Sequence, residues 1–204
     1  LTRSSAASDV YKRQDDTFEK VKFVKGSNIN TMKSVGDQIF ISTNLENIMY
    51  DGNNTSFMGK GFPNAKIIDV FSNNVNTYFA SDQSLIKLDG NKYISEKITF
   101  PSSNVKIQAL LVDDDIDDFG TNQGLWSRQN NKNVKLIKNM NALSLDKASD
   151  GSIIVGAKKG FYYLNKGALK RISPDGKDYV PLSKTAVRDI EVISENEIWY
   201  ATFG

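Results

Sequence analysis

The feature that most constrains the fold is a unit that recurs five times along the chain. Each unit contains an apolar strand that ends in a small residue, then a short polar loop, then a strand with alternating apolar positions. The separations between the small residues are 38, 40, 36 and 45 positions, and these residues are Ser42, Ala80, Gly120, Gly156 and Ala201. Near-constant spacing of this length is typical of a repeat architecture, in which neighbouring units bury a shared core.

The rest of each unit predicts further strands and no helix. The segments that carry the small residues are 39–43, 77–81, 117–121, 153–157 and 198–202, and outer strands are predicted at 94–100, 134–137 and 169–172. Period-2 alternation marks these segments as strands. Four short antiparallel strands in about 40 residues describe one blade of a β-propeller. The sequence therefore predicts an all-β fold, a partial β-propeller of about four four-stranded blades and the start of a fifth.

A β-sandwich is the alternative architecture, but its strands need not repeat at near-constant spacing with matching residue types. In a propeller the small residues have a physical reason, because inner strands crowd together and a small side chain lets neighbouring backbones approach. A closed propeller of this kind usually has more blades. We therefore expect the chain to be an arc of a larger ring, joined to the rest of the same propeller.

The first residues carry a different pattern. Residues 4–14, SSAASDVYKRQ, resemble the translation of a sequencing-library adapter, with eleven matching codons in one frame. The expected organisation is therefore a non-native segment at 1–14 and a propeller fragment at 15–204, because such a segment is excluded from fold reasoning. The chain has 26 Lys and Arg against 24 Asp and Glu, and without residues 1–14 the balance is 23 against 23.

Composition excludes several classes of function. The chain has no Cys and no His, so disulfides, thiolate nucleophiles, His metal ligands and imidazole acid–base chemistry are all absent. A net charge of +2 gives no basic field for nucleic acid. No apolar run approaches the roughly 20 residues of a membrane span. We accordingly expect no catalytic residues, no metal and no cofactor.

Three short motifs resemble the two-component-regulator propeller repeats, whose signature reads W-I-A/G-T-x-G-G-L. They are WYATFG at 199–204, GTNQGLW at 120–126 and GAKKGFY at 156–162. The resemblance spans about residues 29–204, and two repeats depart from it, with Asn47 and Ser84 at positions that are otherwise apolar or glycine. The motifs identify the chain as similar to the sensor region of hybrid histidine kinases.

This resemblance implies a non-enzymatic sensor module, periplasmic or at the cell surface, that binds a carbohydrate or another small ligand. It also implies a downstream signalling region as a partner. In that family such propellers respond to glycan breakdown products. Two other classes stay open. A secretion- or surface-associated scaffold would have the same repeats and no ligand, and a propeller hydrolase or lyase would need a convergent pair of carboxylates.

Five residues are the candidate ligand contacts. Asn122 and Gln123 occupy a loop after a small residue, and their amides can hydrogen-bond sugar hydroxyls. Trp126 lies just beyond and can stack on a sugar ring, although an aromatic residue in such a strand more often packs in the core. Asp117 and Asp118 stand where other repeats have apolar residues, and a carboxylate there is costly unless it is paired or exposed. We expect them to line the channel or a ligand cleft, unless the strand shifts by one residue.

That shift would turn Ile116 inward in place of the two carboxylates. The same region holds a wider acidic cluster, with Asp113, Asp114 and Asp115 preceding the strand. Oxygen ligands of this kind suit Ca²⁺, but the cluster lacks the D-x-D-x-D-G spacing of a calcium loop. The sequence therefore favours a solvated hairpin turn.

Overall fold

The computed structural model describes residues 9–14, 17–22, 28–73, 75–113, 116–130, 132, 134–171, 185–195 and 197–202, with side chains from residue 28 onward. The chain divides into two units, residues 1–96 and 97–204. Within the described residues all regular structure is β-strand. A search of the same residues for a helix long and apolar enough to cross a membrane found none.

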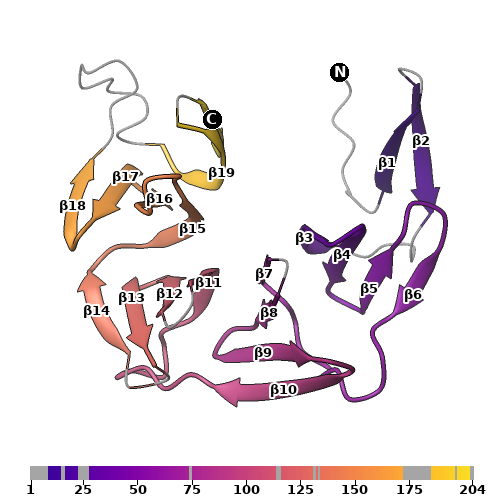
Figure 1. The fold of residues 1–204 in the computed structure, drawn as a ribbon, viewed down its shortest axis with the longest axis horizontal. Coiled ribbons are helices and arrows are strands. Elements are labelled where there is room, and N and C mark those ends of the chain that lie inside the picture. Colours follow the sequence, from indigo (N-terminus) through magenta and orange to yellow (C-terminus); the bar gives the residue numbers. More distant parts are fainter. Residues whose placement is uncertain are drawn as a thin grey trace. The chain divides into compact units, whose positions relative to one another are not determined.

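The first unit contains one hairpin and two four-stranded antiparallel sheets (Figure 1). The hairpin is β1 (Asp9–Gln14) with β2 (Thr17–Lys22). Sheet 1 consists of β3 (Ile29–Val35), β4 (Gln38–Thr43), β5 (Asn47–Tyr50) and β6 (Thr55–Phe57), and sheet 2 of β7 (Asp69–Ser72), β8 (Thr77–Ala80), β9 (Ser84–Asp89) and β10 (Lys92–Lys97). In both sheets the strands follow one another in sequence order, as in a propeller blade.

The second unit contains two more four-stranded sheets of the same order and a final strand pair (Figure 1). Sheet 3 consists of β11 (Ile107–Asp113), β12 (Ile116–Thr121), β13 (Gly124–Gln129) and β14 (Lys135–Lys138). Sheet 4 consists of β15 (Ala142–Lys147), β16 (Ile153–Ala157), β17 (Gly160–Asn165) and β18 (Ala168–Arg171), and sheet 5 of β19 (Val187–Ser194) and β20 (Glu197–Thr202).

The predicted fold class is confirmed: the chain is all-β and its four four-stranded sheets are β-propeller blades, followed by the two strands of sheet 5. The predicted outer strands begin one or two residues from the observed ones, and Ile172 lies outside the described residues. At the start of the chain, β1 pairs with β2, so this hairpin spans the predicted boundary at residue 14.

The small residues lie on the second strand of each sheet, as predicted, and two glycines show why. A Cβ atom on Gly120 would lie 3.2 Å from the Cβ of Ala109 and 3.2 Å from the carbonyl oxygen of Ala142. A Cβ on Gly156 would lie 2.2 Å from the Ser144 hydroxyl. The first strands of the same sheet and, for Gly120, of the next sheet therefore approach too closely for a larger side chain.

An irregularity in the ladder recurs opposite the small residue. The first strand skips one residue in its pairing in four of the sheets, between Ile29 and Thr31, Ile107 and Ala109, Ala142 and Ser144, and Val187 and Asp189. A bulge of this kind bends the strand and increases its twist. Its recurrence at equivalent positions sets the same register in successive sheets.

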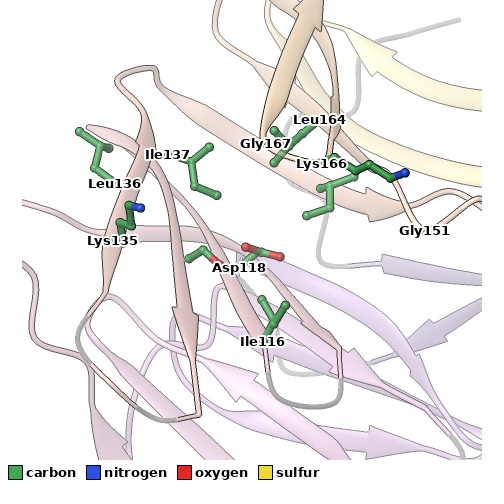
Figure 2. Close-up of a pocket in the computed structure, with 11 residues that line it drawn as sticks. Ile116, Asp118, Lys135, Leu136, Ile137, Gly151, Leu164, Lys166 and Gly167 are labelled. Atoms are coloured by element: carbon green, nitrogen blue, oxygen red, sulfur yellow. The ribbon is translucent and has the colours of Figure 1, made fainter.

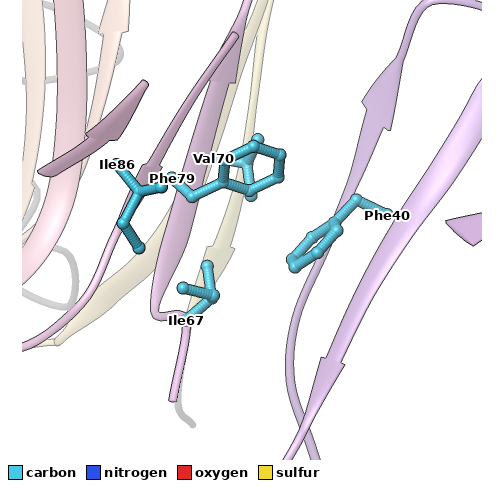
Figure 3. Packing of buried hydrophobic residues seen from close by; sticks show 5 residues of the cluster. All are labelled: Phe40, Ile67, Val70, Phe79 and Ile86. Carbon is cyan, nitrogen blue, oxygen red and sulfur yellow. The ribbon is translucent and has the colours of Figure 1, made fainter. Parts of the chain in front are cut away.

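Apolar side chains between successive sheets form the core. In the first unit, Phe40 of sheet 1 packs against sheet 2 in a buried cluster with Ile67, Val70, Phe79 and Ile86 (Figure 3). The Phe40 and Phe79 rings meet edge to face, with centroids 5.0 Å apart. In the second unit, Ile154 of sheet 4 packs against Val187 and Ile190 of sheet 5.

Candidate functional site

The turn between β12 and β13 holds Asn122 and Gln123, and their amides bond to the chain just before β11. The Asn122 Oδ1 accepts a hydrogen bond from the Lys106 N–H at 2.7 Å, and its Nδ2 donates to the Asn104 carbonyl at 3.0 Å. The Gln123 Nε2 donates to the same carbonyl at 3.2 Å. Both side chains thus tether the segment that leads into sheet 3.

The same tether recurs in sheet 1. There the backbone N–H of Asn28 donates to the Asn44 Oδ1 at 2.8 Å. The hydroxyls of Thr43 and Thr121 accept hydrogen bonds from backbone N–H groups within their turns and donate to the carbonyl three residues on. A polar residue after the small residue therefore has a structural role that repeats with the blade, in addition to any contact with a ligand.

Trp126 lies in the core of sheet 3. Its side chain is 8% exposed and meets the Phe100 ring edge to face, with centroids 5.6 Å apart. The indole Nε1 is buried and has no hydrogen-bond partner in the described structure. A ligand could stack on this ring only after a rearrangement, because Trp126 is almost completely buried.

Asp117 is buried and ion-paired. The Arg128 guanidinium donates to its Oδ2 from Nε at 2.8 Å and from Nη2 at 2.6 Å. The two residues lie directly opposite each other on β12 and β13, and the guanidinium carbon lies 5.8 Å from the centre of the Phe119 ring. The predicted cost of a carboxylate at this position is offset by a charge-assisted hydrogen-bonded pair.

Asp118 points to the other face of the sheet, because successive residues of a strand alternate. It is opposite Ser127 on β13 and lines a cavity of about 430 Å³ between sheets 3 and 4 (Figure 2). The cavity lining comes from both sheets: Ile116, Asp118, Ser127, Lys135, Leu136 and Ile137 of sheet 3, and Gly151, Ile153, Leu164, Lys166 and Gly167 of sheet 4.

The register identifies what Asp118 replaces. Gly120, Ser42 and Gly156 are equivalent, so Asp118 occupies the place of Phe40 in sheet 1 and Ile154 in sheet 4. The alternative of a one-residue shift is therefore not what the structure shows, and Ile116 is 37% exposed. A carboxylate stands where equivalent sheets place the apolar residue that fills the interface with the next sheet.

Burial governs the acidity of this carboxyl group. Asp118 is 4% exposed, and desolvation raises its pKa from 3.8 to about 6. A hydrogen bond from the Ser127 side chain and the charge of Lys147 oppose the rise, whereas Asp117 and Asp113 add to it. The group is therefore mostly ionised at pH 7 and titrates just below neutrality.

The acidic cluster does not converge on one point. Asp113 forms an exposed ion pair with Lys147, Asp117 and Asp118 face opposite ways, and Asp114 and Asp115 lie outside the described residues. In the part of the chain that the structure describes, no three acidic residues come together as metal ligands.

The five predicted contact residues thus do not form one site. Asn122 and Gln123 follow the end of β12, whereas Asp117 and Asp118 lie near its beginning, and Trp126 is enclosed. Of the five, only Asp118 lines the cavity. Most of the other residues that line the cavity come from the outer strands of sheet 3 and from strands and turns of sheet 4. The repeat alignment indicates that Asp118 faces the next blade, but it does not identify the other residues that line the cavity.

Comparisons with known proteins agree with this architecture. No protein-family model and no curated protein matches the sequence significantly. Among solved structures, the chain is similar to the extracellular domain of the BT4673 system of B. thetaiotaomicron, described in one structure as a one-component system and in another as a hybrid two-component system. The first has a TM-score of 0.73 and 21% identity, over 95% of this chain and 29% of that chain.

Other propellers are similar at lower identity. A virginiamycin B lyase from Staphylococcus aureus, crystallised with quinupristin, has a TM-score of 0.70 and 8% identity over 96% of this chain and 71% of that chain. YCF48 bound to a D1 peptide has a TM-score of 0.60 and 12% identity over 92% and 66%. The similarity therefore shows that the chain has a β-propeller fold. The predicted resemblance to the propellers of two-component sensors is confirmed as a resemblance in fold.

Proposed function

We propose that the chain is a ligand-binding sensory module, one part of the extracytoplasmic propeller of a two-component regulator that senses oligosaccharides. The likeness to the extracellular domain of such a system supports this assignment, and this chain spans only 29% of the length of that one. The module would lie in the periplasm or at the cell surface and would work with the rest of its propeller and a downstream signalling region.

The main observation in favour of a binding function is the cavity between sheets 3 and 4. Its volume of about 430 Å³ falls within the range of small-molecule sites, which combine apolar walls with a few polar groups. Here aliphatic side chains form part of the wall, Asp118 is the buried polar residue, and Lys135 and Lys166 are exposed at the cavity. A carboxylate accepts hydrogen bonds only, and sugar hydroxyls can donate them.

The enzymatic alternative has less support. A carboxylate-based hydrolase needs two acidic groups on one substrate, but Asp117 is held by Arg128 on the opposite face from Asp118. The similar solved structures include a lyase. Because its sequence identity to this chain is only 8%, the similarity concerns the fold and does not extend to the catalytic chemistry. We therefore assign binding without chemistry to the module.

Titration calorimetry of the purified protein with neutral, amino and uronate disaccharides tests this function. We expect at least one class to bind, and Asp118→Asn to weaken that binding at least tenfold. Asp37→Asn, which removes the same charge from an exposed turn, is the matched control. Absence of binding by every disaccharide would contradict the assignment.

Asn122 and Gln123 stay predicted contacts, and the same titration tests them. If either amide binds the saccharide directly, Asn122→Ala or Gln123→Ala will weaken the affinity while Asp118→Asn leaves it unchanged. The tether that both amides form with Asn104 makes circular dichroism of each variant a necessary companion measurement.

A further inference from the structure

We propose that the cavity between sheets 3 and 4 binds its ligand through a primary ammonium group that pairs with Asp118, and that its preferred saccharides are therefore amino sugars with a free amine. The first statement stands on the geometry of the cavity. The second rests on the proposed function, because only that function makes the ligand a saccharide.

The carboxylate lacks a cation of its own in the described structure. Its partner there is the Ser127 side chain, which uses one of roughly four acceptor positions on the two oxygens. Two nearby cations have other carboxylates, since Arg128 pairs with Asp117 and Lys147 pairs with Asp113. Lys135 and Lys166 also line the cavity, but within the described residues neither forms an ion pair with Asp118. A buried charge is tolerated when it is paired, so the group that complements Asp118 best is a cation from outside the chain.

Burial makes that pairing effective. Asp118 is 4% exposed, and Figure 2 shows its carboxylate between the labelled residues of the two sheets. An ion pair with ordered hydrogen bonds is stronger in such an environment than in water. An ammonium group supplies three donors, whereas a sugar hydroxyl at the same place supplies one and carries no charge.

The other lining residues restrict the rest of the ligand. Ile137, Ile153 and Leu164 offer apolar contact, which suits an alkyl chain or the C–H face of a sugar ring. Lys135 and Lys166 are exposed at the cavity, and their charge disfavours a second cation on the ligand. The site therefore fits a monoamine better than a diamine.

Calorimetry with matched probes at pH 7 tests both statements. Glucosamine, glucose and N-acetylglucosamine differ at one substituent, and n-butylamine and putrescine test the amine without a sugar. We expect glucosamine to bind at least tenfold more tightly than the two neutral sugars, and n-butylamine more tightly than putrescine. Asp118→Asn should remove the preference for glucosamine, and Asp37→Asn should keep it.

The wild-type protein gives a second readout that needs no variant. Protonation of Asp118, with its pKa near 6, competes with the ammonium group, so glucosamine affinity should fall about tenfold from pH 7 to pH 5. The groups that act on Asp118 are Ser127, Asp117, Asp113 and Lys147, with Lys135 and Lys166 at the cavity.

The outcomes separate the two proposals. Equal binding of glucose and glucosamine, unchanged at pH 5, would overturn the ammonium site and leave saccharide sensing intact. Binding of n-butylamine without any saccharide would uphold the ammonium site and overturn saccharide sensing. Failure of every probe would overturn both.

Discussion

Phe40 and Asp118 occupy the same position in two repeats, yet the interfaces around them differ. In the first unit, Phe40 is fully buried and its ring contacts Phe79 and Phe62, with centroids 5.0 Å and 6.4 Å away. In the second unit, Asp118 faces a cavity of about 430 Å³. The repeat therefore fixes the backbone and the direction of the side chain, and the individual residue decides whether the interface is closed or open.

The backbone of sheet 3 holds its register without the apolar residue, because other contacts take its place. Asp117 and Arg128 lock the opposite face of β12 and β13. Phe119 and Leu125, both fully buried, pack in the same sheet. An interface that gives up one large apolar contact can thus open a cavity while the blade stays intact.

The largest expected effect comes from moving the carboxylate to the closed interface. Phe40→Asp removes a buried aromatic ring, which costs about 3–5 kcal/mol, and also buries an unpaired charge. We therefore expect a loss of at least about 5 kcal/mol, which is enough to unfold a marginally stable domain. Urea unfolding followed by circular dichroism measures it.

Phe57→Asp is the matched control, because Phe57 is 73% exposed. Its effect should stay within about 0.5 kcal/mol. A folded Phe40→Asp protein with near-normal stability would show that the two interfaces tolerate a carboxylate equally, and the comparison would lose its basis.

The next effect concerns the buried ion pair. Arg128→Met leaves the Asp117 carboxylate buried without the two hydrogen bonds of this guanidinium, and the expected loss is about 3–5 kcal/mol. Lys147→Met breaks the exposed pair with Asp113 and should cost at most about 1 kcal/mol. Equal losses in urea unfolding would mean that burial of the pair contributes nothing.

The sequence predicted the fold well because the repeat is redundant. Five small residues, Ser42, Ala80, Gly120, Gly156 and Ala201, define the same strand independently, and the steric reason at Gly120 needs only the crowding of inner strands. The predicted outer strands differ from the observed ones at their ends; β10 runs from Lys92 to Lys97, where the sequence predicted 94–100.

The site was harder to predict because it depends on contacts between sheets. Polar character selected Asn122 and Gln123, but their amides bond to the backbone at Asn104 and Lys106, a pairing that no local pattern reveals. Asp118 was predicted from its unusual place in the repeat. Its neighbours Lys135 and Leu164 come from other strands, and their proximity follows only from the packing of sheet 4 on sheet 3.

The open interface should also show in the pH dependence of stability. The pKa of Asp118 is 3.8 before folding and about 6 after it, so the folded state binds more protons between these values. Its contribution to stability is fully present below pH 4 and is lost as the pH rises through about 6. Because one pKa unit is worth about 1.4 kcal/mol, the loss amounts to about 3 kcal/mol.

Asp118→Asn isolates this term, because the variant cannot titrate there. Urea unfolding of both proteins from pH 3 to pH 8 should show the variant gaining about 3 kcal/mol relative to wild type. The difference is needed because Asp150, whose pKa is lowered to about 2 by hydrogen bonds from Ser152 and Tyr163, acts in the opposite direction. Parallel pH profiles would refute the raised pKa.

The smallest effect compares the two tethers. Asn122 makes two hydrogen bonds to the segment before β11, whereas the Asn44 side chain accepts one from Asn28. At about 0.5–1.5 kcal/mol for each net hydrogen bond, Asn122→Ala should cost about 2 kcal/mol and Asn44→Ala about 1 kcal/mol in urea unfolding. Losses in the reverse order would show that the Asn122 amide contributes little to stability, and a function outside the fold would then be the better account of it.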